Sequence, residues 1–547
     1  MTILLRKSTD LPDPQAYEDW LAVTGTAAAL DLTRKLPNLA ERLEDAFVAE
    51  RETWWALGRS LSAEPSADIA HMPTAGSVGS DFGIMLAWGR LIGGLGGEDA
   101  VTLVLCDDPW LFRHLSALEG VDAGTPPVRA YSSMKLILRG VAARAAVALR
   151  CALAALRLVR GRRTMAPGGP VILVYGHPAS NAQGFDAYFG NLMEQFSGLK
   201  RVLHTDCPVG RARELSTDER TTSLHAWGNP LFALGLILSR WRPGGAHLRS
   251  QYGWLIRRAR ALENGGGGPA MNRWQMHCQE RFLTEAKPDR VLWPWENHGW
   301  ERGLCRTTQR LGIATIGYQH TVIGPHHFNY STATNADGLD SIPDVVVADG
   351  PAYLDELQAW GVPAERLVIG GAFRFPRFGD DLYDPKGPMF VPLSAIPQAA
   401  HAQIEVARTI AESGQRVWVK QHPMYPVIFD QFENLVRANQ PLAEQKGLSA
   451  VLYTTGASGL EAILMGIPAF RLMLDDRIAI DVLPRGVGAM AVSPENAAEK
   501  ILEPKIEPAR ILWEDILSDP DMALWKKLLF DDMDTPASRT KEIKQAS

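Results

Sequence analysis

Residues 450–468 read AVLYTTGASGLEAILMGIP. The first four residues form the pattern of a buried strand, small and hydroxyl-bearing residues follow, and a helix is predicted from Ser458. The free N–H groups at the start of such a helix suit a phosphate. Thr454, Thr455 and Ser458 add hydroxyl donors, and Glu461 could accept hydrogen bonds from ribose hydroxyls. The alternative is that Ser458 only caps its helix and that Glu461 completes a capping box.

A second motif, Lys420-Gln421-His422-Pro423, directly follows a predicted strand at 417–420. The proline stops the strand and fixes the turn, so we expect the side chains of Lys420 and His422 above the edge of a sheet. Such donors suit a monophosphate or diphosphate anion. We expect this loop and the loop after Tyr453 at adjacent strand ends, where both would hold one ligand. The alternative is an ordinary loop histidine, because a His-Pro dipeptide is a weak signal.

A third turn, VIGGAFR at 368–374, ends another predicted strand. Gly371 could let a ligand approach the backbone. The guanidinium of Arg374 could bind a phosphate or carboxylate through two hydrogen bonds. An ordinary glycine turn with a surface arginine explains the same residues equally well.

Outward from these motifs, strands and helices alternate over most of the chain, which predicts an α/β fold with mostly parallel, doubly wound sheets. Ligands of such sheets bind at the carboxyl ends of the strands, where these motifs lie. Residues 1–100 are predicted to be helical. We predict a helical N-terminal region with one strand–helix unit and a basic amphipathic helix (1–165), two Rossmann-like domains (166–340 and 341–510), and a C-terminal helix and tail (511–547).

The combination of KQHP with TTGASGLEAILMGIP resembles the donor site of GT-B glycosyltransferases that use CMP-sugars. These include bacterial sialyltransferases, capsule β-Kdo transferases and the related CDP-glycerol polymerases. The resemblance covers roughly residues 290–500. It implies a GT-B fold, in which two Rossmann-like domains face a cleft, with a helical N-terminal extension. It also implies that His422 and the hydroxyls of Thr454, Thr455 and Ser458 hold the nucleotide phosphate. This chain has Thr-Thr-Gly-Ala-Ser where a pair of serines is common.

The segment WPWENHGWE at 293–301 combines three tryptophans with two carboxylates and a histidine. Tryptophan faces stack on sugar rings, and desolvation by such rings raises the pKa of a carboxyl group. We therefore predict Glu296 as the general base on an acceptor hydroxyl, with Trp295 and His298 in contact with the acceptor. Glu301 is interpreted as a structural partner of Arg302 or Arg306. The alternative is an aromatic core seam in which Glu296 caps the next helix.

Two further loops carry candidate residues on the acceptor side. His320, in IGYQHT at 316–321, is predicted to bind the donor or to act as the base. In CDP-glycerol polymerases, a histidine in a comparable His-Gly element has the role of base, but Thr321 replaces that glycine here. His177 and Asp186, in the polar loop 175–186, are predicted to hold the acceptor. A loop of this composition is also normal at any strand-to-helix junction.

Residues 134–163 form an unusual basic and apolar segment, MKLILRGVAARAAVALRCALAALRLVRGRR. Arg139, Arg150 and Arg157 fall on one face of the predicted helix, and the rest is mainly Ala, Leu and Val. One interpretation is a core-packed helix with a basic solvent stripe. The other is an interfacial helix that lies on anionic lipid. The repeated arginines argue against a transmembrane span.

The composition narrows the class of protein. A net charge of −6 in 547 residues argues against a nucleic-acid binder, which normally has a basic domain. The five cysteines form no CxxC pair, so neither a zinc ribbon nor a disulfide framework is predicted, and reduced thiols fit a cytoplasmic protein. We find no signal-peptide pattern. No acidic pair has the context of a metal site, so we predict a metal-independent reaction without a cofactor.

Together, these patterns predict the transfer of a nonulosonic acid or a Kdo-type sugar from a CMP-sugar to a surface glycan or flagellin acceptor. A UDP-sugar or CDP-glycerol transferase on the same fold, and a non-catalytic GT-B scaffold, remain alternatives. Nucleic acid is not an expected partner. The expected location is the cytoplasm, with peripheral contact to the inner face of an anionic membrane.

Overall fold

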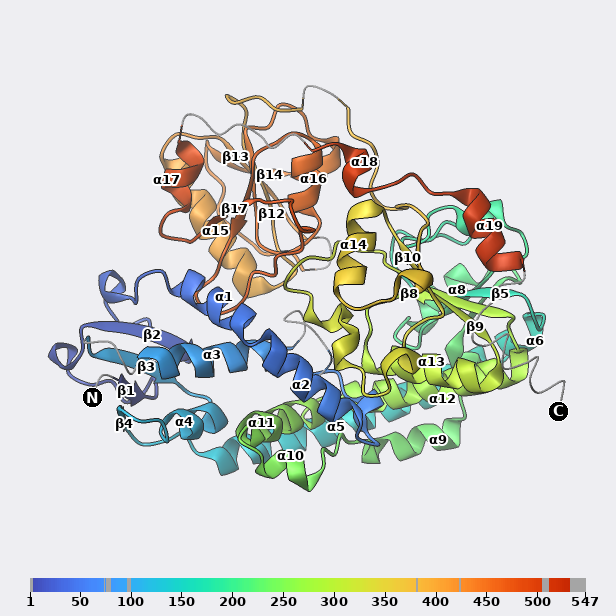
Figure 1. The fold of residues 1–547 in the computed structure, drawn as a ribbon, viewed down its shortest axis with the longest axis horizontal. Helices are drawn as coiled ribbons and strands as arrows, with labels where there is room; N and C mark the ends of the chain where they lie inside the picture. Colours follow the sequence, from blue (N-terminus) through green and yellow to red (C-terminus); the bar gives the residue numbers. More distant parts are fainter. Residues whose placement is uncertain are drawn as a thin grey trace.

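The computed structural model describes residues 3–72, 74, 80–95, 100–379, 382–422, 425–503 and 511–531. Three sheets organise these residues, and every strand pairing within them is parallel. Two of the sheets are doubly wound and belong to separate α/β domains (Figure 1). This arrangement confirms the predicted α/β fold of the GT-B plan.

The central sheet has seven strands in the order β7–β6–β5–β8–β9–β10–β11. Numbered along the chain, β5 to β7 run to one side of the sheet and β8 to β11 to the other. The order therefore reverses between β5 and β8, and this is the topological switch point at which doubly wound sheets bind ligands. The strands span Pro170–Val174 (β5), Lys200–Leu203 (β6), Thr221–Ser223 (β7), Arg290–Pro294 (β8), Ala314–Tyr318 (β9), Val345–Ala348 (β10) and Leu367–Ile369 (β11).

The third sheet has six strands in the order β14–β13–β12–β15–β16–β17, with its switch point between β12 and β15. The loop after β15 begins at Thr454 and lies at this switch point. The predicted adjacency of the two phosphate-type loops is wrong, because β12 separates β13 from β15. Their ends are about 10 Å apart at the usual strand spacing. The strands span Met389–Pro392 (β12), Val417–Lys420 (β13), Leu435–Ala438 (β14), Ala450–Tyr453 (β15), Ala469–Leu472 (β16) and Met490–Val492 (β17).

The predicted domain boundary at 340/341 is wrong. Strands β10 and β11 follow it in the sequence but pair with β9 and β10 in the central sheet. The C-terminal helix α19 (Met522–Phe530) also returns to this domain, where Trp525 is fully buried and donates its indole N–H to the carbonyl of Gly370 (2.9 Å). The domain of the third sheet is thus inserted between two parts of the central domain.

The N-terminal region contains the predicted helices, but it also carries strands that were not predicted. Its own four-stranded sheet has the order β2–β3–β1–β4. The prediction missed β1 and β2 because each is short and lies among polar residues, whereas the apolar β3 was found. The strands span Ile3–Arg6 (β1), Asp19–Thr24 (β2), Thr102–Cys106 (β3) and Val121–Ala123 (β4).

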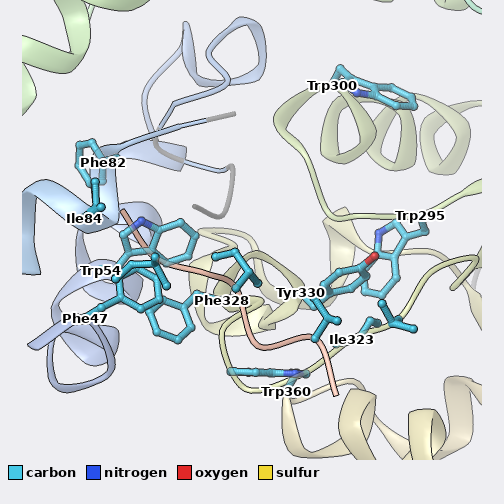
Figure 2. Close-up of a cluster of buried hydrophobic side chains, with 14 of the residues drawn as sticks. Phe47, Trp54, Phe82, Ile84, Trp295, Trp300, Ile323, Phe328, Tyr330 and Trp360 are labelled. Carbon is cyan, nitrogen blue, oxygen red and sulfur yellow. The ribbon is translucent and has the colours of Figure 1, made fainter. Parts of the chain in front are cut away.

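An aromatic cluster joins the N-terminal region to the central domain (Figure 2). Phe47 of α1 stacks on Phe328 with ring centroids 4.6 Å apart, and Trp54 of α2 lies against the same ring. Arg471 of β16 pairs with Glu44 of α1 at 2.5 Å, so the N-terminal region also contacts the third domain. The first helices span Leu39–Ala49 (α1), Arg51–Ser62 (α2), Phe82–Leu95 (α3) and Pro109–Leu115 (α4).

The other helices pack on the two large sheets or, as α9, α10 and α11 do, on neighbouring helices. The glycine run 265–268 separates α11 from α12. The helices of the central domain include Gly161–Thr164 (α6), Leu192–Gln195 (α7), Val209–Leu215 (α8), Pro230–Leu234 (α9), Gly245–Arg249 (α10), Gly253–Asn264 (α11), Gly268–Ala286 (α12), Gly299–Leu311 (α13), Pro351–Ala359 (α14) and Trp513–Ile516 (α18). Those of the third domain are Pro397–Glu412 (α15), Ser458–Leu464 (α16) and Ala497–Leu502 (α17).

The basic segment forms one long helix, α5 (Arg129–Leu158). Arg144 is buried and donates to the carbonyls of Ile237 (3.0 Å) and Asn264 (2.5 Å), whereas Arg139, Arg150 and Arg157 are exposed. Many apolar side chains of α5 are also exposed, which a purely core-packed helix does not explain. Within the described residues, no helix has the length and apolarity that a bilayer crossing requires.

Candidate functional site

Glu296 lies just beyond the carboxyl end of β8, at the switch point of the central sheet. The next residue, Asn297, has a left-handed backbone (φ 60°) and is fully buried. Its side-chain amide donates to the carbonyl of Asn329 (2.9 Å) and to Oδ1 of Asn335 (3.0 Å). These hydrogen bonds hold a backbone conformation that is otherwise costly for a residue other than glycine. The turn therefore fixes the direction of the Glu296 side chain.

The Glu296 carboxylate lies among histidines. Its Oε2 is 2.8 Å from Nε2 of His298, and its Oε1 is 3.7 Å from Nε2 of His320. Burial opposes ionisation, but the hydrogen bond and charge of His298, with His320 and His327, lower the pKa of Glu296 to about 2. The prediction that neighbouring tryptophans raise this pKa is wrong.

The neighbouring histidines respond differently to the same environment. Burial lowers the pKa of His298, but the hydrogen bond and charge of Glu296 outweigh it and raise the pKa. For His320 burial dominates, and the pKa falls to about 4 despite the attraction of Glu296. At neutral pH the Glu296 carboxylate is thus ionised and His320 is neutral, while the carboxylate raises the proton affinity of His298.

Glu301 is the carboxyl group with the raised pKa. Its side chain is fully buried, and burial raises its pKa to about 7. Its Oε2 accepts hydrogen bonds from the backbone N–H groups of Glu296 (3.0 Å) and His298 (3.2 Å). His298 is the N-cap residue of α13, so Glu301 stabilises the turn that carries the site. The predicted partnership of Glu301 with Arg302 or Arg306 is therefore wrong, and so is the alternative in which Glu296 caps the helix.

A cavity of about 380 Å³ lies beside Glu296, between the two large domains. Glu296, His298 and Thr321 line it from the loops after β8 and β9 of the central sheet, while Thr455 and Gly456 line it from the loop after β15. The carboxyl edges of both sheets thus meet at one cavity. The remaining lining residues are His71, Val322, His327, Asn329, Tyr330, Ile480 and Val482.

The tryptophans of the segment 293–301 are part of the core. Trp293 and Trp295 are fully buried, and Trp295 packs edge-on against Tyr330 in the aromatic cluster (Figure 2). Gly317 is needed beside Trp295, because an added Cβ would lie 2.9 Å from its side chain. The prediction that Trp295 stacks on an acceptor is wrong, and the aromatic-seam alternative describes these rings correctly.

His320 and Arg374 lie together on the acceptor side. The His320 ring packs edge-on against Tyr188, and the Arg374 guanidinium lies over the same Tyr188 ring, 5.9 Å from its centroid. Nη1 of Arg374 also donates to the carbonyl of His320 (3.4 Å). Within the described part of the chain, no carboxylate lies within 4.0 Å of Arg374. The charge of Arg374 also acts on Glu461 of the third domain, where it opposes the rise in pKa that burial causes.

The two acceptor candidates in the loop 175–186 differ in how far their side chains are exposed. His177 is half-buried, and its ring packs edge-on against Tyr188. Asp186 is fully buried and accepts hydrogen bonds from the Ser180 hydroxyl (3.2 Å) and the Tyr188 backbone (2.9 Å), with Arg201 at 3.9 Å. The structure therefore contradicts a direct acceptor contact for Asp186, which instead holds its loop in shape.

The loop after β15 places its residues unequally. Thr455, Gly456 and Ser458 are partly accessible, whereas Thr454 is buried and its hydroxyl has no hydrogen-bond partner within the described residues. Ala457, not Ser458, is the N-cap residue of α16, and no side chain caps this helix. The capping-box alternative is therefore wrong. Burial raises the pKa of Glu461.

The remaining donor-side candidates lie farther from this cavity. His422 is partly exposed beside Tyr425, and burial lowers its pKa. Lys420 donates to the backbone carbonyl of Asn439. Gly371 has φ 84°, and an added Cβ would meet the carbonyl oxygen of Asp519 at 2.2 Å. The close approach at Gly371 is thus made by the chain's own C-terminal segment.

Sequence reasoning missed two histidines of the cavity. His71 comes from the N-terminal region, and its ring centroid is 5.1 Å from that of His298. His327 also lines the cavity, and it contributes to the low pKa of Glu296. No local pattern marks either residue, because only the folded chain brings them to Glu296. Across the described residues, no group of His, Cys, Asp and Glu has an arrangement suited to a metal ion.

No protein-family model matches this chain, and no curated protein matches it. Among solved structures, the chain is similar to the glycotransferase of kitacinnamycin, at 13% identity over 61% of this chain and 90% of that one, with a TM-score of 0.34. It is also similar to UGT89C1 of Arabidopsis thaliana (12% identity, 69% and 94% coverage, TM-score 0.36). UDP-N-acetylglucosamine 2-epimerase from Rickettsia bellii is a third such structure (13%, 69% and 95%, TM-score 0.31).

Proposed function

We propose that this protein is a glycosyltransferase that moves a nonulosonic acid or Kdo-type sugar from a CMP-sugar to a surface glycan or flagellin acceptor. The observation that carries the proposal is the cavity between the two domains. It brings a carboxylate–histidine pair, Glu296 and His298, to the same space as Thr455 and Gly456 of the proposed donor loop. A transferase needs this combination, because the acceptor hydroxyl must lose a proton where the donor is bound.

The proposed donor site consists of the loops after β13 and β15. The N–H groups around Gly456, the hydroxyls of Thr455 and Ser458, and the His422 imidazole would bind the nucleotide phosphate. Arg374 supports an acidic sugar in particular. It is exposed beside His320, its charge reaches Glu461, and it lacks a carboxylate partner among the described residues. A sugar carboxylate would supply that partner through a bidentate pair.

The proposed chemistry is removal of the acceptor proton by the Glu296–His298 pair. A carboxylate with a pKa of about 2 is a weak base on its own, so we assign proton uptake to His298 and its orientation to Glu296. His320, neutral and 3.7 Å from the other carboxylate oxygen, is the second candidate base. The donor loop would stabilise the charge that develops on the departing CMP. No metal or cofactor enters this proposal.

The proposal includes a cytoplasmic location with peripheral contact to an anionic membrane. The support is α5, which exposes apolar side chains between exposed arginines over much of its length. This contact would bring the cavity near an acceptor that is assembled at the membrane.

Nucleotide protection and donor hydrolysis test the proposal. We expect CMP to raise the melting temperature more than UDP or CDP, and we expect the protein to release CMP from a CMP-sugar. Stronger protection by UDP or CDP would instead support a UDP-sugar or CDP-glycerol transferase. Protection without any nucleotide release, with several acceptors present, would support the non-catalytic scaffold.

A further inference from the structure

A second cavity, of about 530 Å³, is lined by arginines and lies away from the proposed transfer site. It is formed by the first half of α5, the segment 240–242 and α11. Six arginines line it: Arg129, Arg144, Arg240, Arg242, Arg257 and Arg260. All except Arg144 are exposed, and within the described residues none of the six has a carboxylate within 4.0 Å. The cavity therefore offers several guanidinium groups without a carboxylate partner, and such groups bind phosphate and carboxylate anions through charge-assisted hydrogen bonds.

The sequence keeps negative charge away from this cavity. No acidic residue occurs between Asp122 and Asp186, or between Glu219 and Glu263, although the whole chain has a net charge of −6. These two stretches supply every arginine of the cavity. Burial lowers the pKa of Arg144, and the like charge of Arg240 lowers it further, so the two guanidinium groups repel each other. The indole N–H of Trp241, which also lines the cavity, is buried and has no partner among the described groups.

An exposed apolar surface adjoins the arginine cavity. On α5, Tyr131, Leu138, Leu149 and Leu156 are each at least 59% exposed. Helix α9 and the following turn Gly235–Leu238 pack along α5 and add Leu231 (78%) and Leu238 (71%). On α5 these leucines recur every seven to eleven residues and so form one stripe along the helix. Ile137 and Leu136 extend the apolar lining into the cavity itself.

We infer that this face docks on a membrane, with the arginine cavity holding the phosphate headgroup of an anionic lipid and the apolar stripe entering the interface. The two features fit the two parts of such a lipid, because guanidinium groups bind phosphate bidentately and exposed leucines leave water at the acyl boundary. Helices α5, α9, α10 and α11 lie on the side of the molecule opposite the domain of β12–β17 (Figure 1). Docking would therefore leave the donor domain facing the cytoplasm. The inference rests on the proposed membrane contact and not on the identity of the donor.

The test is vesicle flotation of the full chain. We expect binding to phosphatidylcholine vesicles that contain phosphatidylglycerol, and much weaker binding to phosphatidylcholine alone. An arginine near an anionic surface contributes about 1 kcal/mol. The triple variant Arg240→Gln/Arg257→Gln/Arg260→Gln should therefore bind the mixed vesicles roughly 100-fold more weakly, at about tenfold per 1.4 kcal/mol.

The matched control is Lys386→Gln/Arg416→Gln/Lys446→Gln, which removes three exposed cations from the domain of β12–β17. It should bind the mixed vesicles like the wild type. The variant Leu138→Ser/Leu149→Ser/Leu156→Ser tests the apolar stripe. These side chains are exposed, so we expect the variant to fold normally but to lose binding to the mixed vesicles. CMP protection of all three variants should remain normal, so a failed donor assignment would not alter these results.

Four outcomes would overturn the inference. They are equal binding to vesicles with and without phosphatidylglycerol, unchanged binding of the arginine triple variant, and affinity for inorganic phosphate in calorimetry that equals the affinity for vesicles. The fourth is a stable dimer in sedimentation that the leucine variant converts to monomer, because the stripe would then be an interface between two copies of the chain.

Discussion

The substitution Glu296→Gln separates the possible roles of the Glu296 carboxylate. It keeps the size of the side chain but removes the charge that His298 and His320 face. A hydrogen bond to a charged group contributes about 1.5–3 kcal/mol. Because 35% of the Glu296 side chain is exposed, solvent screening favours the lower part of this range, about 1.5–2 kcal/mol. If Glu296 only orients and polarises His298, kcat should therefore fall roughly 10- to 30-fold.

The assay is CMP release from the donor with acceptor present, measured across pH, with CMP protection in thermal melts as the control for donor binding. Loss of the Glu296 charge removes the interaction that raises the pKa of His298. A histidine that acts as base then stays neutral to lower pH, so the acidic limb of the kcat/KM profile should move to lower pH. A loss above about 100-fold would show that Glu296 is itself the base, because that is the usual share of general-base catalysis. Near-normal turnover, with loss of activity in His320→Ala, would refute the assignment to the pair and identify His320 as the base.

Three further predictions concern ligand binding, metal dependence and pH. His422→Ala should weaken CMP binding in calorimetry by about 1.5–3 kcal/mol, the contribution of a hydrogen bond to a charged group; unchanged affinity would contradict its contact with the phosphate. Turnover should survive EDTA, and activity that EDTA removes and Mg²⁺ or Mn²⁺ restores would reveal a metal ligand that we did not identify. The Glu296–His298 pair should stabilise the protein most between about pH 4.5 and 6.5. The pKa of Glu296 is lowered from 4.5 to about 2, so its contribution is present above pH 4.5 and is lost as the pH falls through 2. The pKa of His298 is raised from 6.5, so its contribution is present below pH 6.5 and is lost as the pH rises through the raised value. The melting temperature of the wild type should exceed that of Glu296→Gln most within this window, and a difference that is flat from pH 3 to 9 would contradict the coupling.

The elements that the sequence predicted well are those with a local signal. The strands at 417–420 and 450–453 were located by short apolar runs that end in polar or glycine-rich turns. The pairing of strands has no such signal. Strand β10 has the apolar pattern that either domain would accept, and only the folded chain shows that it adds to β9. Periodicity therefore could not predict that β10 and β11 belong to the central domain.

The candidate site shows the same division. Glu296 was found because it follows a strand end, which is a local property. Its pKa depends on His298, His320 and His327, which come from three positions along the chain, and no spacing rule brings them together. Density of tryptophan was a poor guide to ligand contact, because rings as large as Trp295 are mostly used to fill a core.

The insertion of the third domain also decides how this chain can be divided for study. The segment 382–503 enters and leaves through a single region of the central domain, near Gly371 and Asp519, and it carries a hydrophobic core of its own. A gene fragment encoding that continuous segment should yield a folded nucleotide-binding unit. A fragment that stops after residue 375 would instead expose the site where Trp525 packs against Tyr318 and Phe373. Truncation from the C-terminus thus damages the acceptor half of the protein before the donor half, the reverse of what the linear order of the sequence suggests.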